Sequence, residues 1–305
     1  MSTPARVLII AGSDSGGGAG IQADLKTVTC LGGYAMTAIT AITAQNTMGV
    51  FGVHPVPEAF IAQQIDLCLS DIGADAIKTG MLHSAGVIDT VIASLDRFLS
   101  SPLRGEDQGG GDLTANARGG ITPTLPSPLK GEGYRIPLVV DPVMVAKGGS
   151  PLLEEAALDA LRTRLIPRAT LITPNLPEAE LLLGRAIAET DDDMIASVNE
   201  LMLLGCKSVL LKGGHASGET LTDVLGMGTQ PAILLKTKRI DTQHTHGTGC
   251  TFASAIATGL AQKLDLASAV RRAHTYVQDA IAAAPGLGHG HGPLGHGVAI
   301  PRRGH

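Results

Sequence analysis

Residues suited to phosphate chemistry are concentrated in one segment, Asp241–Thr251, with the sequence Asp-Thr-Gln-His-Thr-His-Gly-Thr-Gly-Cys-Thr. The apolar stretch Phe252–Leu264 follows at once, which indicates a loop that opens a helix. Two glycines let the backbone approach a ligand, and the free N–H groups of a first helical turn attract anions. We therefore expect a phosphoryl group to bind at Gly247, Thr248, Gly249 and Cys250. A plain helix N-cap in a glycine-rich loop is the alternative, which this segment alone leaves open.

The glycine-rich segment Gly12–Gly20 matches neither of two common phosphate-binding motifs. It lacks the G-x-G-x-x-G pattern, and Leu25 stands where a Walker loop requires glycine before Lys26. The chain is therefore neither an evident dinucleotide binder nor a P-loop protein. We interpret Gly12–Gly20 as a flexible loop that closes over a small substrate, placed before a helix that carries Asp24. A solvent-exposed tight connection is the alternative.

The composition indicates an enzyme-sized globular chain without a nucleic-acid footprint. Its 305 residues are 44% hydrophobic and 17% charged, enough for one large α/β domain, and the net charge is −5. Seven Phe and Tyr residues and no Trp leave little for base stacking, so we expect no nucleic-acid partner. The N-terminal apolar run Val7–Ala11 is only a strand's length, so we expect a cytoplasmic protein without a membrane partner. Four cysteines without a C-x-x-C pair indicate reduced thiols.

Strand-like and helix-like runs alternate along the chain, which predicts βαβ units and a three-layer α/β/α fold with a mostly parallel central sheet. The predicted strands are Arg6–Ala11, Ala35–Thr43, Ala76–Thr79, Leu138–Val140, Leu171–Thr173 and Ser208–Leu211. The predicted helices between them are Pro57–Ser70, Ser84–Phe98, Glu154–Leu165, Pro177–Leu183 and Met194–Leu204. Polar residues follow six strand ends, and ligands bind outside the carboxyl ends of such strands. The sequence therefore predicts one pocket at this edge.

Six motifs, in the same order, resemble the hydroxymethylpyrimidine/phosphomethylpyrimidine kinases of thiamine biosynthesis, members of the ribokinase-like superfamily. They are Ala11–Asp24, Lys78–Leu82, Asp141–Met144, Thr173–Ala179, Leu211–His215 and Thr245–Cys250, and the resemblance covers nearly all of residues 5–99 and 136–297. It implies a single ribokinase-like domain, two ATP-dependent phosphorylations with Mg²⁺, and a homodimer. The substrates implied are 4-amino-5-hydroxymethyl-2-methylpyrimidine and then its monophosphate.

The resemblance also implies roles for individual residues. Asp141 and Glu178 would hold Mg²⁺ through its waters, and Asn175 and Glu178 match the family's N-x-x-E motif. Asn175 with Glu178 is equally typical of a helix cap, and both roles can hold together. Lys212 would face the nucleotide phosphates; an exposed strand-end lysine is the alternative. Gly12, Ala19 and Asp24 would complete the substrate side.

Two side chains are assigned to the pyrimidine by their chemistry. The amide of Gln45 can donate and accept in one plane, as an aminopyrimidine edge requires. Met81 can lie against the ring as an adaptable apolar wall.

Cys250 occupies the position where many sugar kinases of the superfamily carry a catalytic aspartate. A thiol at a helix N-terminus can have a lowered pKa, so we expect its thiolate to accept the hydroxymethyl proton. The alternative is that Cys250 packs beside the pyrimidine while a loose transition state needs little base assistance.

Two segments of unusual composition are given no role in the predicted site. Residues 100–135 contain a short internal repeat in a Gly/Pro-rich surround and depart from the family, so we expect a disordered insertion. The His/Gly-rich stretch Gly286–His296 is interpreted as an ordinary terminal loop and not as a metal site. Two other functions remain open: a pyridoxal or pyridoxamine kinase, and a non-catalytic pyrimidine sensor.

Overall fold

The computed structural model describes residues 3–99, 136–144, 155–214 and 218–299. The insertion expected at about 100–135 lies outside the described residues, as does His215. Within the described part of the chain, no helix combines the length and the apolar character that a membrane span requires.

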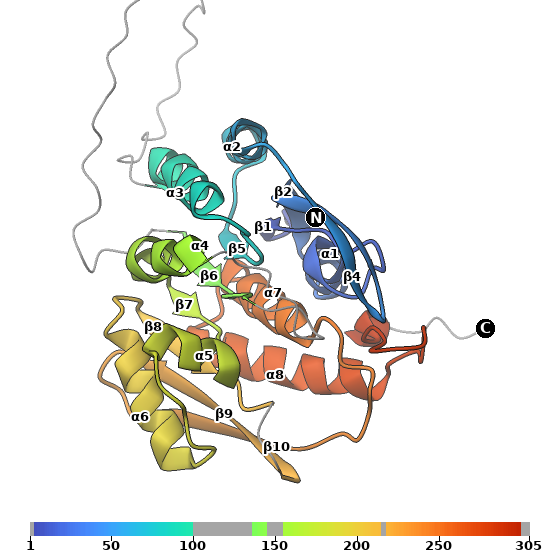
Figure 1. The fold of residues 1–305 in the computed structure, drawn as a ribbon, viewed down its shortest axis with the longest axis vertical. Coiled ribbons are helices and arrows are strands. Elements are labelled where there is room, and N and C mark those ends of the chain that lie inside the picture. Colours follow the sequence, from blue (N-terminus) through green and yellow to red (C-terminus); the bar gives the residue numbers. More distant parts are fainter. Residues whose placement is uncertain (1–2, 100–135, 145–154, 215–217, 300–305) are drawn as a thin grey trace, which may run out of the picture.

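An eight-stranded sheet organises the described residues, in the order β10-β9-β8-β7-β6-β5-β1-β2 (Figure 1). The six strands from β2 to β8 in this order pair in parallel. Strand β9 pairs antiparallel with both of its neighbours, β8 and β10. The strands are β1 (Arg6–Ala11), β2 (Tyr34–Ile39), β5 (Ala76–Thr79), β6 (Leu138–Val140), β7 (Leu171–Ile172), β8 (Ser208–Leu211), β9 (Thr220–Met227) and β10 (Ile233–Lys238). The predicted mostly parallel α/β/α architecture is confirmed.

Helices cover both faces of this sheet (Figure 1). One face packs against α2 (Glu58–Leu67), α3 (Ala85–Leu99), α4 (Glu155–Ala160), α5 (Leu176–Leu183) and α6 (Asp191–Met202). The other packs against α1 (Gly20–Cys30), α7 (Thr248–Ala261) and α8 (Leu266–Ala282). Short helical segments complete the fold: η1 (Cys68–Ile72) follows α2, η2 (Leu161–Leu165) and η3 (Ile166–Arg168) follow α4, and η4 (His296–Ala299) packs against α1 and α8.

Strand β1 shows why a continuous apolar run belongs at the centre of such a sheet. Leu8 and Ile10 face the core shared with α2 and α3, while Val7, Ile9 and Ala11 face the core shared with α1 and α7. All five are at most 1% exposed. A strand buried on both faces has no polar side to alternate with, which is the pattern expected of a parallel sheet.

The predicted strand Ala35–Thr43 was wrong in extent, because the chain leaves the main sheet at Thr40. The Thr40 N–H donates to Ala11 O at 3.0 Å, and its hydroxyl donates to Met81 O at 2.7 Å. Beyond this anchor, β3 (Ala41–Asn46) pairs with β4 (Gly49–Pro55) in a separate two-stranded antiparallel sheet. The hairpin carries Gln45 and Val50 to the pocket.

Candidate active site

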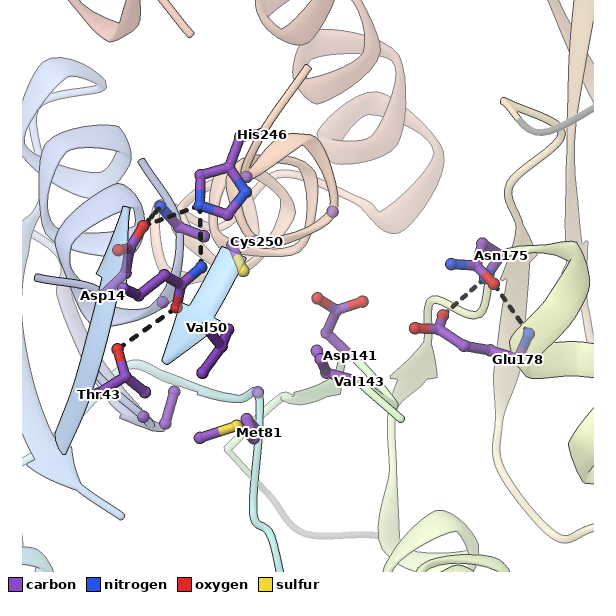
Figure 2. Close-up of a pocket in the computed structure, with 18 of the residues that line it drawn as sticks. Asp14, Thr43, Val50, Met81, Asp141, Val143, Asn175, Glu178, His246 and Cys250 are labelled. Carbon is purple, nitrogen blue, oxygen red and sulfur yellow. Dashed lines mark hydrogen bonds and ion pairs between the residues drawn. The ribbon is translucent and has the colours of Figure 1, made fainter. Parts of the chain in front are cut away.

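A pocket of about 460 Å³ lies where the carboxyl ends of the parallel strands meet the N-terminus of α7. Asp14 and His246 lie on one side of it, Asn175 and Glu178 on the other, with Asp141 and Cys250 between them (Figure 2). Most of the residues predicted from the sequence line it: Gly12, Ala19, Gln45, Met81, Asp141, Asn175, Glu178, Lys212, Gly247, Gly249 and Cys250. Two predicted residues, Asp24 and Thr248, do not.

The N-terminus of α7 forms the middle of the pocket. Gly247 is the N-cap with φ +84°, in the left-handed region that favours glycine. A Cβ atom there would also collide with the carbonyl of Gly18, so two glycine loops meet at this point. A Cβ atom on Gly249 would lie 3.3 Å from Lys212 Nζ and 3.6 Å from Asp141 Oδ2. The helix therefore begins beside a cation and a carboxylate, with the N–H groups of its first turn available to an anion.

The side chain of Thr248 has a local role. Its hydroxyl donates to Thr245 O at 2.8 Å within the loop that precedes α7. The backbone N–H of Thr248 also donates to Thr245 O, at 3.4 Å, so the cradle consists of Gly247, Gly249 and Cys250 at the pocket wall.

Asp141 and Lys212 form a buried pair at the ends of β6 and β8. Asp141 Oδ1 accepts from Lys212 Nζ and from the Thr173 hydroxyl, both at 3.0 Å. Burial opposes ionisation of Asp141, but Lys212 and Lys78 outweigh it and lower the pKa of this carboxyl. Asp141 is therefore an anion held by one oxygen, and its other oxygen faces Gly249. The alternative of an exposed strand-end lysine is wrong, because the Lys212 side chain is 12% exposed.

Asn175 and Glu178 form a capping box at the start of α5. The Glu178 N–H donates to Asn175 Oδ1 at 2.8 Å, and the Asn175 N–H donates to Glu178 Oε2 at 2.9 Å. Both residues also line the pocket, so the cap and the pocket wall are the same groups. Burial raises the pKa of Glu178 to about 7, with Asp141 adding to the effect and Lys212 opposing it.

The opposite end of the pocket has an apolar wall and a polar corner. Met81 lies against Gly12 so closely that a Cβ atom on Gly12 would collide with its methyl group. Val50 adds a second apolar surface from the β3–β4 hairpin. Gln45 is half-buried, and its terminal amide atoms lie 3.3 Å from Thr43 Oγ1 and 3.2 Å from His246 Nε2.

Asp14 organises this polar corner, a role that the sequence did not reveal. Its carboxylate accepts from the N–H groups of Gly16, Gly18 and Ala19 at 2.8–2.9 Å, and from His246 Nε2 at 2.9 Å. Burial opposes ionisation, but these donors lower the pKa of Asp14. The Gly12–Gly20 segment is thus folded around a buried carboxylate: Gly12, Asp14 and Gly18 are buried, whereas Ser15 and Gly16 at its centre are exposed, as the alternative of an exposed tight connection predicts.

Asp24 requires a correction, because the structure does not bring it to the pocket wall. It is fully buried beneath the site, where both carboxylate oxygens lie 3.0 Å from Lys78 Nζ and one accepts from Ser254 Oγ at 2.6 Å. Burial disfavours the lysine cation, but Asp24 more than compensates and raises the pKa of Lys78. Asp24 therefore ties α1 to β5 and α7, and its partner Lys78 lines the pocket in its place.

The expected lowering of the Cys250 pKa was wrong in direction. Burial raises the pKa of this thiol to about 12, with Lys78 opposing and the carboxylates of Asp24 and Asp141 adding to the rise. The thiol is therefore protonated at neutral pH. Its side chain still lines the pocket between the two ends (Figure 2).

A family model described as phosphomethylpyrimidine kinase matches residues 14–103 and 127–295. The hydroxymethylpyrimidine/phosphomethylpyrimidine kinase of Bacillus subtilis is 40% identical over 292 residues, 95% of this chain and 94% of the relative. The thiamine biosynthesis bifunctional protein ThiED of Geobacter sulfurreducens is 46% identical over 96% of this chain, which spans 52% of that relative's length.

Solved structures show the same fold. The ADP complex of Bacillus subtilis pyridoxal kinase has a TM-score of 0.78 and 35% identity, covering 96% of this chain and 98% of that one. The phosphomethylpyrimidine kinase of Clostridium difficile has a TM-score of 0.70 and 38% identity, covering 90% and 99%. With a family model over most of its length and relatives of this identity, the chain belongs to the phosphomethylpyrimidine kinase family.

Proposed function

We propose that the chain transfers the γ-phosphoryl group of ATP to 4-amino-5-hydroxymethyl-2-methylpyrimidine, and then phosphorylates the monophosphate to the diphosphate. The observation that carries this proposal is the position of the α7 N-terminus between two chemically different ends of one pocket. One end offers an amide and apolar walls for a small polar ring. The other offers carboxylates and a lysine for phosphates and a cation.

Mg²⁺ fits the second end. Asp141 and Glu178 are near enough for the charge of one to raise the pKa of the other, a repulsion that a bound cation removes. Among the described residues, no group of three or more His, Cys, Asp or Glu side chains is arranged as a metal cage. Two carboxylates suit a magnesium ion that keeps most of its waters and travels with ATP. When bound, it would neutralise phosphate charge.

The reaction then depends on positioning. Lys212, beside Gly249, would place a positive charge against the phosphoryl group in transfer, and the backbone N–H groups of the cradle would bind its oxygens. Gln45 would hold the edge of the aminopyrimidine, with Met81 against its face, so that the hydroxymethyl group points toward the cradle. The raised pKa of the Cys250 thiol argues against its accepting the hydroxymethyl proton, and the variant Cys250→Ala tests that role.

Pyridoxal kinase activity is a second candidate, because a solved structural neighbour is the pyridoxal kinase of Staphylococcus aureus in complex with AMP-PCP and pyridoxal, 32% identical with a TM-score of 0.78. A coupled assay of ADP release with hydroxymethylpyrimidine, its monophosphate and pyridoxal in parallel decides between them. We expect the highest kcat/KM with the pyrimidines. Pyrimidine binding without ADP release would indicate the sensor. A homodimer and a cytoplasmic location also stay predictions, the first to be tested by sedimentation velocity.

A further inference from the structure

The inference concerns the polar corner formed by Asp14, His246, Gln45 and Thr43, and it rests on the proposed function. His246 Nε2 has two polar neighbours, Asp14 Oδ2 at 2.9 Å and the terminal amide of Gln45 at 3.2 Å. A neutral imidazole nitrogen is either a donor or an acceptor, and never both at once. If Asp14 requires Nε2 to be a donor, the Gln45 atom that faces Nε2 must be an acceptor.

Asp14 determines which ring nitrogen of His246 carries a hydrogen. Its carboxylate already accepts three backbone N–H groups and can only accept, so His246 Nε2 must carry the proton. An unprotonated Nε2 would place a lone pair against a buried anion. Since Nε2 carries this one hydrogen, the atom of Gln45 that faces it must be the amide oxygen, which can share the hydrogen with Asp14, whereas an amide N–H would face a second donor.

Thr43 leads independently to the same orientation. Its hydroxyl lies 2.8 Å from Ser13 O, which can only accept, so its single proton points there. Thr43 Oγ1 therefore offers a lone pair to the other amide atom of Gln45 at 3.3 Å. That atom must be the amide nitrogen. The orientation with oxygen toward His246 and nitrogen toward Thr43 satisfies both neighbours with the heavy atoms where they are, since exchanging the two amide atoms is a half-turn of χ3.

The frame around Gln45 is rigid enough to keep this orientation. The backbone N–H of Gln45 donates to Ser15 Oγ, and Ser15 Oγ donates to Gln45 O, both at 2.8 Å. His246 is 9% exposed, its N–H donates to Gly292 O at 3.1 Å, and Gly18 packs against its ring. The structure places the Gln45 amide the other way round, with Oε1 toward Thr43 and Nε2 toward His246, and the exchange of these two atoms gives the corner one acceptor and one donor in fixed places.

We propose that His246 and Thr43, by fixing the amide of Gln45, make the pocket select a 4-aminopyrimidine against its 4-oxo counterpart. An aminopyrimidine edge carries an N–H donor beside a ring-nitrogen acceptor, whereas the oxo compound carries a carbonyl acceptor beside a ring N–H donor. Against a fixed amide, only one of the two patterns pairs. Turning the oxo ring over would restore the pairing, but it would carry the hydroxymethyl group away from the α7 cradle. His246 and Thr43 are positioning residues in this scheme.

The experiment compares kcat/KM for the 4-amino substrate and for its 4-oxo analogue in the same ADP-release assay. We expect the wild type to favour the amino compound by about 100-fold or more, since an unpaired buried polar group is costly. His246→Leu and Thr43→Val each remove one of the two anchors and should lower the preference, and the double variant, which frees the amide to turn, should bring it below about tenfold. His246→Gln keeps an N–H donor at similar reach and should retain most of the preference.

His244→Leu is the matched control, because His244 lies in the same loop but does not line the pocket. It should keep the wild-type preference. The proposal is overturned if the wild type uses both compounds equally, or if the preference survives both His246→Leu and Thr43→Val in folded protein. Should His246→Leu fail to fold, Thr43→Val alone decides. A wild type that phosphorylates neither pyrimidine would instead refute the proposed function.

Discussion

Replacing Cys250 by alanine tests whether its thiolate is the catalytic base, and the structure changes the expected size of the effect. With a pKa of about 12, forming the thiolate at pH 7.5 costs roughly 6 kcal/mol, at 1.36 kcal/mol per unit. General-base catalysis contributes about 10²–10⁴ in rate, which is roughly 3–5 kcal/mol. The cost exceeds the gain. We therefore expect Cys250→Ala to retain turnover within about tenfold of the wild type, in place of the 10²–10⁴-fold loss that a thiolate base implies.

The assay is kcat from coupled ADP release at saturating pyrimidine, ATP and Mg²⁺, between pH 7.5 and 9.5. This range lies above the pKa of Glu178, about 7, so that carboxyl is already mostly ionised and its further ionisation changes the rate by far less than tenfold. A thiolate base with a pKa near 12 would make wild-type turnover rise about tenfold per pH unit, or about 100-fold over the range. We expect a flat profile in both wild type and Cys250→Ala. A steep wild-type profile that Cys250→Ala abolishes would refute this reasoning and establish the base.

Three further predictions address other parts of the pocket. Gln45→Leu should weaken pyrimidine binding by about 1–3 kcal/mol and leave the KM for ATP nearly unchanged; equal weakening of both ligands would indicate a folding role. The Mg²⁺ concentration for half-maximal rate should fall as pH rises from 6 to 8, because the Glu178 carboxylate ionises with a pKa of about 7 and its charged form holds the cation. Glu178→Gln should remove this dependence, and a persisting dependence would assign it to another group. Lys78→Met leaves the Asp24 charge buried alone and should lower the free energy of unfolding in urea by about 3–5 kcal/mol. The double variant with Asp24→Asn should recover part of this, and an unchanged single variant would contradict the stabilising role of the pair.

Secondary structure was predictable where strands are buried on both faces. Arg6–Ala11, Ala76–Thr79, Leu138–Val140 and Ser208–Leu211 have the expected bounds. Three of them are mainly apolar runs typical of a parallel sheet, whereas Ala76–Thr79 also carries the buried Lys78. The bend at Thr40 was not predictable, since apolar residues continue across it and the anchors, Ala11 and Met81, are distant in sequence.

The antiparallel strand β9, the edge strand β10 and the helix α8 were not predicted. Exposed side chains alternate with partly buried ones along β10, and its apolar run Ile233–Leu235 is short and gives way to Lys236, Thr237 and Lys238. The signal for α8 was present: Asp265 caps the helix through the N–H of Ser268, and apolar residues follow at helical spacing.

The candidate site was predictable as a set of motifs, but not the direction of each side chain. Asp14 and Asp24 lie in one motif, and the sequence analysis placed Asp24 at the pocket wall, where the structure has Asp14. Helical spacing held a clue, because Ile21, Asp24 and Val28 fall on one face of α1 and all are buried. The pKa of Cys250 depends on how much protein covers the helix start, which no local sequence pattern encodes.

The pocket joins the two ends of the chain, and this determines when a ligand can first bind. Asp14 contacts His246 across 232 positions, and Asp24 contacts Ser254 across 230. Contacts at such separation close the longest loops of the chain and tend to form late in folding. A chain still emerging from the ribosome can pair its early strands, yet it has no pocket until α7 docks. Nucleotide and substrate therefore bind only the finished fold, and their binding free energy stabilises that state alone against unfolding and proteolysis.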